Sequence, residues 1–343
     1  MRAYGRRKLL ALAAGVLAAA TACTGNAAPA PSKAAAAASA TPSPSAVEYA
    51  VTPAEAAKVF SEITASDDLL RVKKDPSLES LEGRLALAQD LTTGGQTQLT
   101  VAAYLSTGYA PPRYRWGSPT FFVPKFRVGE PALWFSALAT RNGQPALLTF
   151  AKTDDWRISS VAELLPAQEL PEIELDADGY ATALAADDKS ITISPQFMGP
   201  VHASVAETGS AGVTAGLLAP GPYTTDVAEQ IAALRTKAKK AELSYDSIFS
   251  ADNYPVYALR TKDGGALIQY SLSRNSTTRN MLDTTYKLPV PPEASWAIGD
   301  PTVPLSIKLT ETHQYATAVP PLTTPKAATV IAHQGALTRA AGT

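Results

Sequence analysis

The stretch PALWFSALATRNGQPALLTFAKTDDWRISSVAEL, residues 131–164, decides the fold class. It contains three apolar or alternating runs, separated by the turn signals RNG at 141–143 and TDD at 153–155. Asn and Gly between such runs are typical of tight hairpins. Together with the preceding run PTFFVPKF at 119–126, the stretch predicts four successive antiparallel strands.

Helices are expected before these strands. Thr52-Pro53-Ala54-Glu55 places Thr at an N-cap, Pro at the first helical position and Glu three residues after the cap, which is the pattern of a capping box. A helical stripe follows over 78–88, and Val101, Tyr104 and Leu105 suggest more helix after a Gly-Gly break. Helices followed by a meander of strands predict an α+β layer.

The second half repeats this order. A helix expected from 225 to about 243 carries apolar residues on one face and lysines on the other. Strands are expected at 255–261, 266–273, 303–315 and 328–337. The sequence therefore predicts two helix-then-antiparallel-sheet domains, cone-shaped or cystatin-like, at 47–185 and 186–343. The repeated rhythm suggests an ancient duplication, although no residue-level repeat is visible.

The first residues have the features of a secretory signal: a basic start, an apolar stretch from Leu9 to Ala20, and small residues beyond it. The apolar stretch is short for a membrane span. Ala20-Thr21-Ala22-Cys23 resembles the lipobox of bacterial lipoproteins, which implies removal of the signal peptide 1–22 and lipidation of Cys23. The alternative is an ordinary signal peptide with an incidental cysteine. Arg6-Arg7 also resembles a twin-arginine export signal, with a generic basic start as the alternative.

Residues 23–46 are dominated by Ala, Pro, Ser and Thr, which provide little apolar area to bury. This composition predicts a disordered tether. A flexible chain of that length spans about 25–30 Å between its ends. The expected location is therefore the extracytoplasmic face of the cell membrane, with the body tethered through the lipid anchor.

Composition excludes several chemistries. Four of the 30 basic residues lie in the leader, against 31 acidic residues, so the processed chain is mildly acidic and poorly suited to nucleic acid. The single cysteine excludes an intramolecular disulfide and a Cys-based zinc site. Gly-x-Ser-x-Gly, Ser-x-x-Lys, Walker and dinucleotide motifs do not occur. We therefore expect no catalytic residue, cofactor or metal, and lean toward a protein that is not an enzyme.

Two weaker metal signals have simpler explanations. His202, His313 and His333 are isolated in the sequence; the last two could share adjacent strands, either as a metal pair or as ordinary hydrogen-bonded histidines. Asp176-x-Asp178-Gly179 imitates the start of a calcium loop, but the position that should close the shell is Ala185. A tight turn explains that motif better.

Residues 50–165 resemble the cone-shaped fold of nuclear transport factor two, ketosteroid isomerase and polyketide cyclases. The resemblance rests on N-terminal helices and on a long strand ending in Leu148-Thr149-Phe150 that returns into Trp156-Arg157-Ile158. It implies an apolar cavity in which an acidic residue faces tyrosines. The aromatic residues that could line it, or simply pack in the core, are Tyr104, Tyr109, Tyr114, Trp116 and Trp134.

The segment LPEIELDADGYA at 170–181 resembles a recurring feature of an uncharacterised family of actinobacterial lipoproteins of similar length. This likeness extends over most of the mature chain and implies secretion without a known activity.

The segment YAPPRYRW at 109–116 mixes aromatics, prolines and arginines, as binding surfaces do, although a rigid connector is an equal alternative. We expect a non-enzymatic binding or scaffolding module for an envelope protein, polymer or apolar ligand. The alternative is a cone-fold enzyme or lipid carrier with a cavity in the first domain; a transporter solute-binding protein, which requires βαβ units, ranks third. The expected contact residues are Tyr109, Arg113, Tyr114, Arg115, Trp116 and Trp134.

Overall fold

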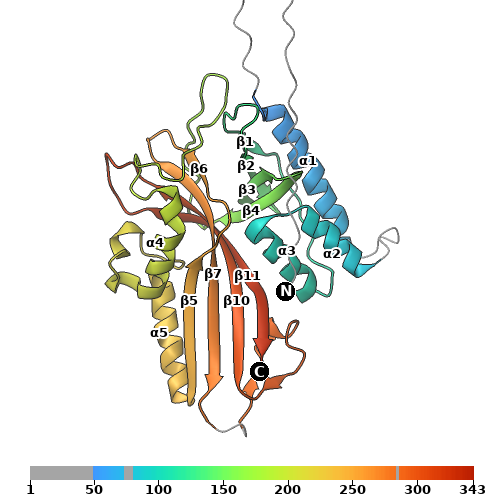
Figure 1. Cartoon of the computed structure of the whole chain (residues 1–343), viewed down its shortest axis with the longest axis vertical. Helices are drawn as coiled ribbons and strands as arrows, with labels where there is room; N and C mark the ends of the chain where they lie inside the picture. The colour runs from blue at the N-terminus through green and yellow to red at the C-terminus, as the bar shows by residue number, and fades with distance from the viewer. Residues whose placement is uncertain (1–48, 73–79, 283–285) are drawn as a thin grey trace, which may run out of the picture. The chain divides into compact units, whose positions relative to one another are not determined.

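The computed structural model describes residues 49–72, 80–282 and 286–343 (Figure 1). The expected signal peptide 1–22 and the whole expected tether 23–46, Cys23 included, lie outside the described residues. Helices and a large antiparallel sheet make up the body, so the predicted α+β class is confirmed. No helix among the described ranges combines the length and apolar character needed to cross a membrane.

Three helices and four strands occur among the described residues of the first half. They are α1 (Pro53–Leu70), α2 (Leu81–Asp90), α3 (Gly94–Ser106), β1 (Thr120–Phe122), β2 (Leu133–Arg141), β3 (Gln144–Lys152) and β4 (Trp156–Leu164). The expected helix start is confirmed, because Thr52 Oγ1 accepts from the Glu55 amide at 3.1 Å. The Glu55 carboxylate accepts from Trp156 Nε1 at 3.1 Å, which joins α1 to the sheet. Of the strand expected at 119–126, only the three residues of β1 form a strand.

The second half contains two helices and the longest strands. They are α4 (Pro195–Thr208), α5 (Thr225–Lys240), β5 (Leu243–Ala251), β6 (Tyr257–Arg260), β7 (Ala266–Asn280), β10 (Ser306–Val319) and β11 (Thr329–Gly342). Short pieces complete it: β8 (Leu288–Pro289), β9 (Thr302–Val303), η1 (Gly209–Ala211), η2 (Ala215–Leu217) and η3 (Pro292–Ala294). Helix α5 ends at Lys240. Strand β5 begins at Leu243, which is about where the sequence analysis placed the end of the helix.

One sheet runs through both halves. Its strand order is β1-β2-β3-β4-β11-β10-β7-β5, with β6 also paired to β7. The halves join where β4 pairs with β11, through Glu163 opposite His333 and Leu164 opposite Ala332. Residues Val47–Thr343 form one compact unit. The boundary expected at 185/186 therefore does not separate two sheets, because the last strand of the chain returns to pair with β4.

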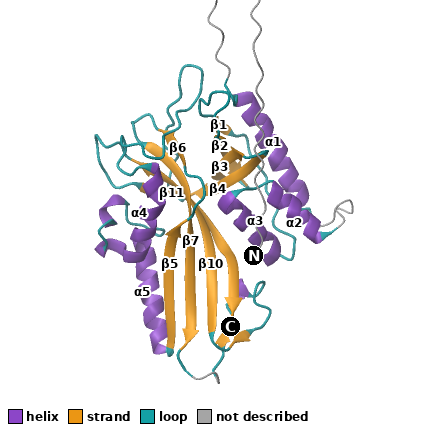
Figure 2. Ribbon diagram, in the orientation of Figure 1, coloured by secondary structure: helices purple, strands orange, loops and turns teal. Residues whose placement is uncertain are grey.

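Helices cover the outer faces of the two halves of the sheet (Figure 2). The inner faces of the two halves pack against each other. Helix α1 packs on the outer face of β2–β4, where Phe60 contacts Phe150. Helices α4 and α5 pack on the outer face of β5, β7 and β10. The inner faces of the two halves meet in a shared apolar cluster that includes Trp134, Leu147 and Leu267. This shared core explains why the halves form one unit.

Buried polar side chains align the two inner faces. Ser136 on β2 and Thr149 on β3 are 2.9 Å apart, and the Gln269 side chain on β7 bonds both, at 2.9 and 2.8 Å. Gln314 on β10 donates to the Ser159 carbonyl on β4 at 3.0 Å. Because these groups are buried and satisfied by one another, a shift of one face against the other would leave them unpaired.

Candidate functional site

The loop at 109–116, which the sequence singled out, is fixed at several points. Tyr109 has a φ of 64°, and its amide donates to the Tyr104 carbonyl at 2.6 Å. The exposed Arg113 forms an ion pair with Asp68 at the end of α1. The Arg115 amide donates to Asn142 Oδ1 at 2.8 Å. These contacts hold the loop as a rigid connector between α3 and the sheet.

At the centre of this loop, Tyr114 lies between two buried arginines. The guanidinium carbon of Arg71 is 4.3 Å from the Tyr114 ring centroid, and that of Arg141 is 4.8 Å away. Each arginine has a carboxylate partner: Asp67 at 2.7 Å for Arg71, and Glu163 at 2.9 Å for Arg141. A cation over an aromatic face is favourable, more so away from water. Two cations therefore hold the ring in place.

The charge of Arg71 is maintained despite its burial. Burial alone lowers the pKa of Arg71, but the adjacent Asp67 carboxylate outweighs it and raises the pKa of Arg71 above its usual value. Asp68, which pairs with the exposed Arg113, has a pKa lowered mainly by the hydrogen bond from that arginine. Arg71 and Asp68 therefore stay ionised at neutral pH.

Tyr114 forms one end of an open groove of about 470 Å³, which lies between α3 and the η3 segment, over β11. We call this the α3–β11 groove. Its lining is Leu99, Ala102, Ala103, Ser106, Thr107, Tyr114, Pro292, Glu293, Ser295, Trp296, Gln334, Ala336 and Leu337. Small residues leave space between two half-exposed aromatics, Tyr114 and Trp296. Apolar lining with a few polar groups and a volume in this range is typical of small-molecule sites.

Gln334 connects the groove to the buried charges. Its Oε1 accepts from Arg141 Nη2 at 2.7 Å, which orients the side-chain amide. Among the groove residues, Glu293 is the one carboxylate, and no histidine occurs. The arrangement can bind a ligand through aromatic faces and a few hydrogen bonds.

A second, smaller cavity of about 40 Å³ also contacts Tyr114. Its lining includes Arg71, Gln96 and Arg141. That volume suits water rather than an organic ligand. Gln96 Oε1 is buried there without a hydrogen-bond partner among the described residues. This space is therefore much smaller than the cavity expected for a cone-fold carrier.

The remaining expected residues are dispersed. Tyr104 is fully buried between α2 and α3. Trp134 belongs to the core between the halves, with its ring 5.1 Å from that of Tyr257. Trp116 packs edge-on against Phe60, with 6.1 Å between the ring centroids. Of the six expected contact residues, Tyr114 alone lines the groove, and the sequence missed Trp296 and Gln334.

The three histidines, treated as isolated from the sequence, come together on the outer face of the sheet. His313 and His333 lie on the adjacent strands β10 and β11, as the sequence analysis allowed, and His333 is opposite Tyr315; the approach of His202 was not expected. His313 Nδ1 and His333 Nε2 are 3.0 Å apart. His202 on α4 packs against Tyr315, with 4.4 Å between the ring centroids. Together they form a buried cluster of histidines and tyrosines.

Hydrogen bonds fix the tautomer of His202. Its Nε2 lies 2.6 Å from the Tyr223 carbonyl, which can only accept, so Nε2 carries the proton. Its Nδ1 then accepts from the Tyr270 hydroxyl at 2.7 Å. Burial lowers the pKa of His202 and of His313 to about 4, and that of His333 to about 3. All three are therefore neutral at pH 7.

No set of three or more His, Cys, Asp or Glu side chains in the described part of the chain is arranged to hold a metal ion. The segment that imitates a calcium loop is a turn. Asp176 Oδ1 accepts from the amides of Asp178 and Tyr180, at 2.9 and 3.0 Å, and Gly179 has a φ of 84°. The other Asp176 oxygen accepts from Lys125 Nζ at 2.6 Å. The turn interpretation is confirmed.

Three uncharacterized lipoproteins of Streptomyces are similar to this chain. One from Streptomyces coelicolor is 27% identical over 246 residues, 66% of this chain and 68% of the relative. One from Streptomyces avermitilis is 28% identical over 153 residues, 43% and 44% of the two chains. A second S. coelicolor protein is 26% identical over 238 residues, 65% and 66% of the two chains. No solved structure matches, so the likeness to the cone-shaped fold stays a prediction.

The sequence profile of a family described as a domain of unknown function (DUF8094) matches residues 47–342. This match covers both halves of the sheet and agrees with their single compact unit. The relatives confirm the resemblance to an uncharacterised actinobacterial lipoprotein family. The chain therefore belongs to the DUF8094 family.

Proposed function

We propose that the protein is a binding module of the cell envelope, held at the extracytoplasmic face of the membrane through a lipid on Cys23, and that the α3–β11 groove is its ligand site. The observation that carries this proposal is the fixed position of Tyr114 at one end of the groove. Two buried, paired arginines hold an aromatic ring that is still partly exposed. Such pre-organisation lowers the entropy cost of binding.

The groove suits a ligand with flat apolar faces and hydrogen-bonding edges. Trp296 offers an aromatic ring and Tyr114 the exposed part of its ring, while Gln334, Glu293 and Thr107 add polar atoms to the lining. A sugar ring has this combination, since its C–H faces pack on aromatic rings and its hydroxyls seek acceptors and donors. We therefore propose an envelope polysaccharide as the ligand. Binding is the role that these aromatic rings and polar groups support.

Calorimetric titration of the full chain with soluble polysaccharide fragments released from the envelope tests this proposal. We expect binding that Trp296→Ala weakens by about tenfold or more, as loss of an aromatic anchor commonly does. The matched control is Tyr286→Ala, which removes an aromatic side chain that is 50% exposed and does not line the groove. Equal affinities of the two variants would reject the groove as the site.

The anchor has a separate test. Cys23→Ala removes the only thiol of the chain, and with it the proposed lipid attachment. The variant should leave the membrane fraction and appear in the medium. Unchanged membrane retention of this variant would contradict lipidation at Cys23.

A further inference from the structure

The far end of β7, where the chain turns toward β8, exposes four large apolar side chains. Met281 is 65% exposed, and Leu282, Tyr286 and Leu305 are each 50% exposed. We call these four residues the apolar tip. Large apolar side chains gathered at one end of a folded unit mark an interaction surface. This surface is separate from the α3–β11 groove and does not depend on its proposed function.

The backbone of the apolar tip is held from inside by one buried residue. The side-chain nitrogen Nδ2 of Asn280 donates to the Tyr286 carbonyl at 2.6 Å, and the side-chain oxygen Oδ1 of Asn280 accepts from the Leu282 backbone amide at 3.0 Å. The Asn280 backbone amide donates to the Leu305 carbonyl at 2.9 Å. Asn280 itself is only 8% exposed. The exposed side chains therefore project from a fixed support.

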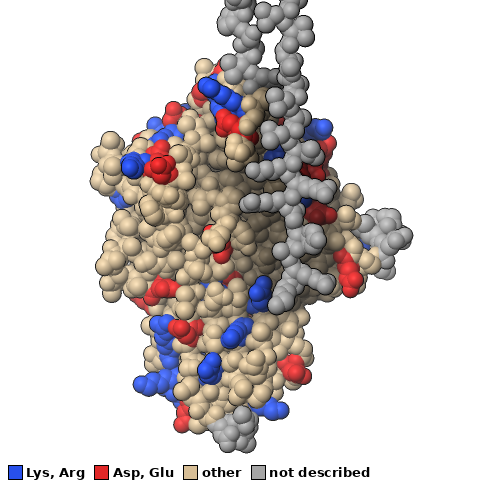
Figure 3. Space-filling view, viewed as in Figure 1, with Lys and Arg blue, Asp and Glu red and all other residues tan. Residues whose placement is uncertain are grey.

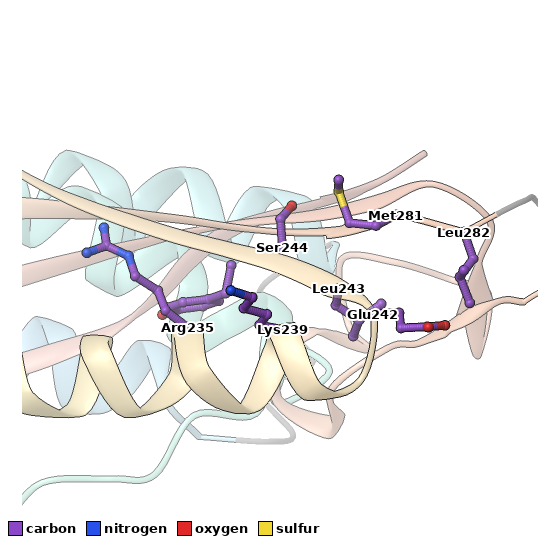
Figure 4. A pocket seen from close by; sticks show the side chains of 8 residues that line it. Arg235, Lys239, Glu242, Leu243, Ser244, Met281 and Leu282 are labelled. Atoms are coloured by element: carbon purple, nitrogen blue, oxygen red, sulfur yellow. The ribbon is translucent and has the colours of Figure 1, made fainter.

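A shallow hollow of about 580 Å³ lies beside the tip, between β5 and the last turns of α5. Figure 4 shows Met281 and Leu282 beyond β7, with Leu243 and Glu242 at the α5–β5 turn and Lys239 on the helix. The hollow thus places apolar side chains next to two cations, Arg235 and Lys239, and one carboxylate, Glu242. That combination matches a phospholipid, whose headgroup is charged and whose chains are apolar.

Exposed cations surround the tip. Lysines gather at the end of α5, where Figure 3 shows a group of basic side chains. The cations near the tip are Lys239, Lys240, Arg279, Lys287 and Lys308, each exposed. None of these five forms an ion pair with a carboxylate of the described residues. Their charge is therefore available to an anionic surface.

We propose that the apolar tip and its surrounding cations dock on a bilayer that contains anionic phospholipids. Apolar side chains next to lysines are the pattern by which proteins lie on membrane interfaces. Each lysine near an anionic surface adds to the attraction. Helix α1 begins at the opposite end of the body from the tip (Figure 1). A lipid anchor that precedes α1 in the sequence and a contact at the tip would therefore attach the body to the membrane at two separate points.

A bilayer is favoured over a protein partner because the matched relatives are lipoproteins, for which the membrane is the surface within reach. Tethering turns a weak second contact into an intramolecular one, so modest affinity suffices. A protein partner with an acidic rim is the competing occupant, and the experiment below separates the two.

The single cysteine of the chain makes a site-specific probe practical. In the full chain with Cys23→Ser, which removes the proposed lipid anchor, Leu282→Cys carries an environment-sensitive fluorophore at the tip. The matched control is Leu322→Cys in the same background, because Leu322 is also exposed, at 57%, and follows the other end of β10. We expect the label at 282 to brighten with phosphatidylglycerol–phosphatidylcholine vesicles, and the label at 322 not to respond.

Charge is tested on the same labelled protein. Lys239→Glu combined with Lys240→Glu should weaken partitioning into the phosphatidylglycerol vesicles by about tenfold or more, since two attractive charges become repulsive. Vesicles of phosphatidylcholine alone should bind as weakly as this variant binds the anionic ones. All these side chains are exposed, and coincident thermal unfolding curves would establish that each variant is folded.

Equal responses of the labels at 282 and 322 would overturn the proposal, and so would vesicle binding that is indifferent to the lysine substitutions. Photo-crosslinking from position 282 in intact cells should recover lipid. Recovery of a single protein there, without lipid, would replace the bilayer with a protein partner. If the lysine variant fails to fold, the paired labels still decide the question.

Discussion

Tyr114 is the residue on which the groove and the buried charges both depend. Its ring separates two arginines that are each buried with a carboxylate partner. Removing the ring would take an aromatic contact away from both cations. Burial of charge is tolerated only where the surroundings compensate for lost hydration.

Tyr114→Ala should therefore destabilise the protein by about 2–4 kcal/mol, because two desolvated cation–aromatic contacts and their packing are lost. Tyr114→Phe keeps the ring face and should cost less than about 1 kcal/mol. Urea unfolding of the two variants measures the difference. If Phe proved as harmful as Ala, the hydroxyl rather than the ring face would be the important group.

The histidine cluster predicts acid sensitivity. His202 has a pKa of about 4 when folded, against about 6.5 in the unfolded chain. Between these two pKa values the unfolded state therefore binds more protons than the folded state. The contribution of His202 to the free energy of unfolding is complete above about pH 6.5 and decreases as the pH falls toward 4. For His202 alone the loss is about 2 kcal/mol between pH 7 and pH 5.

Denaturant unfolding at pH 7 and pH 5 tests this effect. His202→Gln can still donate to the Tyr223 carbonyl and accept from the Tyr270 hydroxyl, but does not titrate. Its stability should change less between the two pH values than that of the parent protein. An unchanged pH dependence in the variant would mean that His202 does not contribute to acid sensitivity.

At the scale of elements, the sequence pattern predicted the structure correctly where the apolar pattern and the turn residues indicate the same element. Strands β2, β3 and β4 were anticipated because apolar runs and tight turns agree there. Helix α4 was missed, since Gly199 and Pro200 lie in its middle and both disfavour helix. Packing decides instead: a Cβ at Gly199 would lie 3.0 Å from the Ala251 side chain, so this glycine allows α4 to approach β5 closely.

Gly199→Leu should therefore push α4 from the sheet and destabilise the protein by about 1–3 kcal/mol, as overpacking does. Phe197→Ala is the matched control, because Phe197 lies on the same helix but is 55% exposed. Thermal melts of both variants give the comparison. A larger effect at 197 than at 199 would show that the close contact with β5 is not what positions the helix.

Only part of the lining of the groove could be predicted from the sequence. Tyr114 stands out in the sequence because aromatics, prolines and arginines cluster around it. Trp296 and Gln334 lie far along the chain and show no local motif. They reach Tyr114 only because β11 pairs with β4, and long-range strand order leaves no local signal in one sequence. The sequence suggested that His313 and His333 lie on adjacent strands, but gave no signal that His202 packs beside them.

At the scale of the whole molecule, two halves that look like separate domains share one sheet and one inner core. Leu147 and Trp134 from the first half pack with Leu267 from the second. Gln269 and Gln314 bond across the same interface. Neither half can bury its inner face without the other.

The described body should therefore unfold in one cooperative transition. Calorimetric and van't Hoff enthalpies should agree, and circular dichroism should follow the same curve as tryptophan fluorescence. Two resolved transitions would contradict the shared core and restore the boundary expected at 185/186.

Photo-crosslinking from the α3–β11 groove in native envelopes tests the central claim most directly. A benzophenone side chain at Ser106, on the exposed rim of the groove, is compared with one at the exposed Leu322, away from it. The proposed function predicts a polysaccharide adduct at 106 that is absent at 322. No adduct at 106, the same adducts at both positions, or a protein in place of the polysaccharide would contradict it.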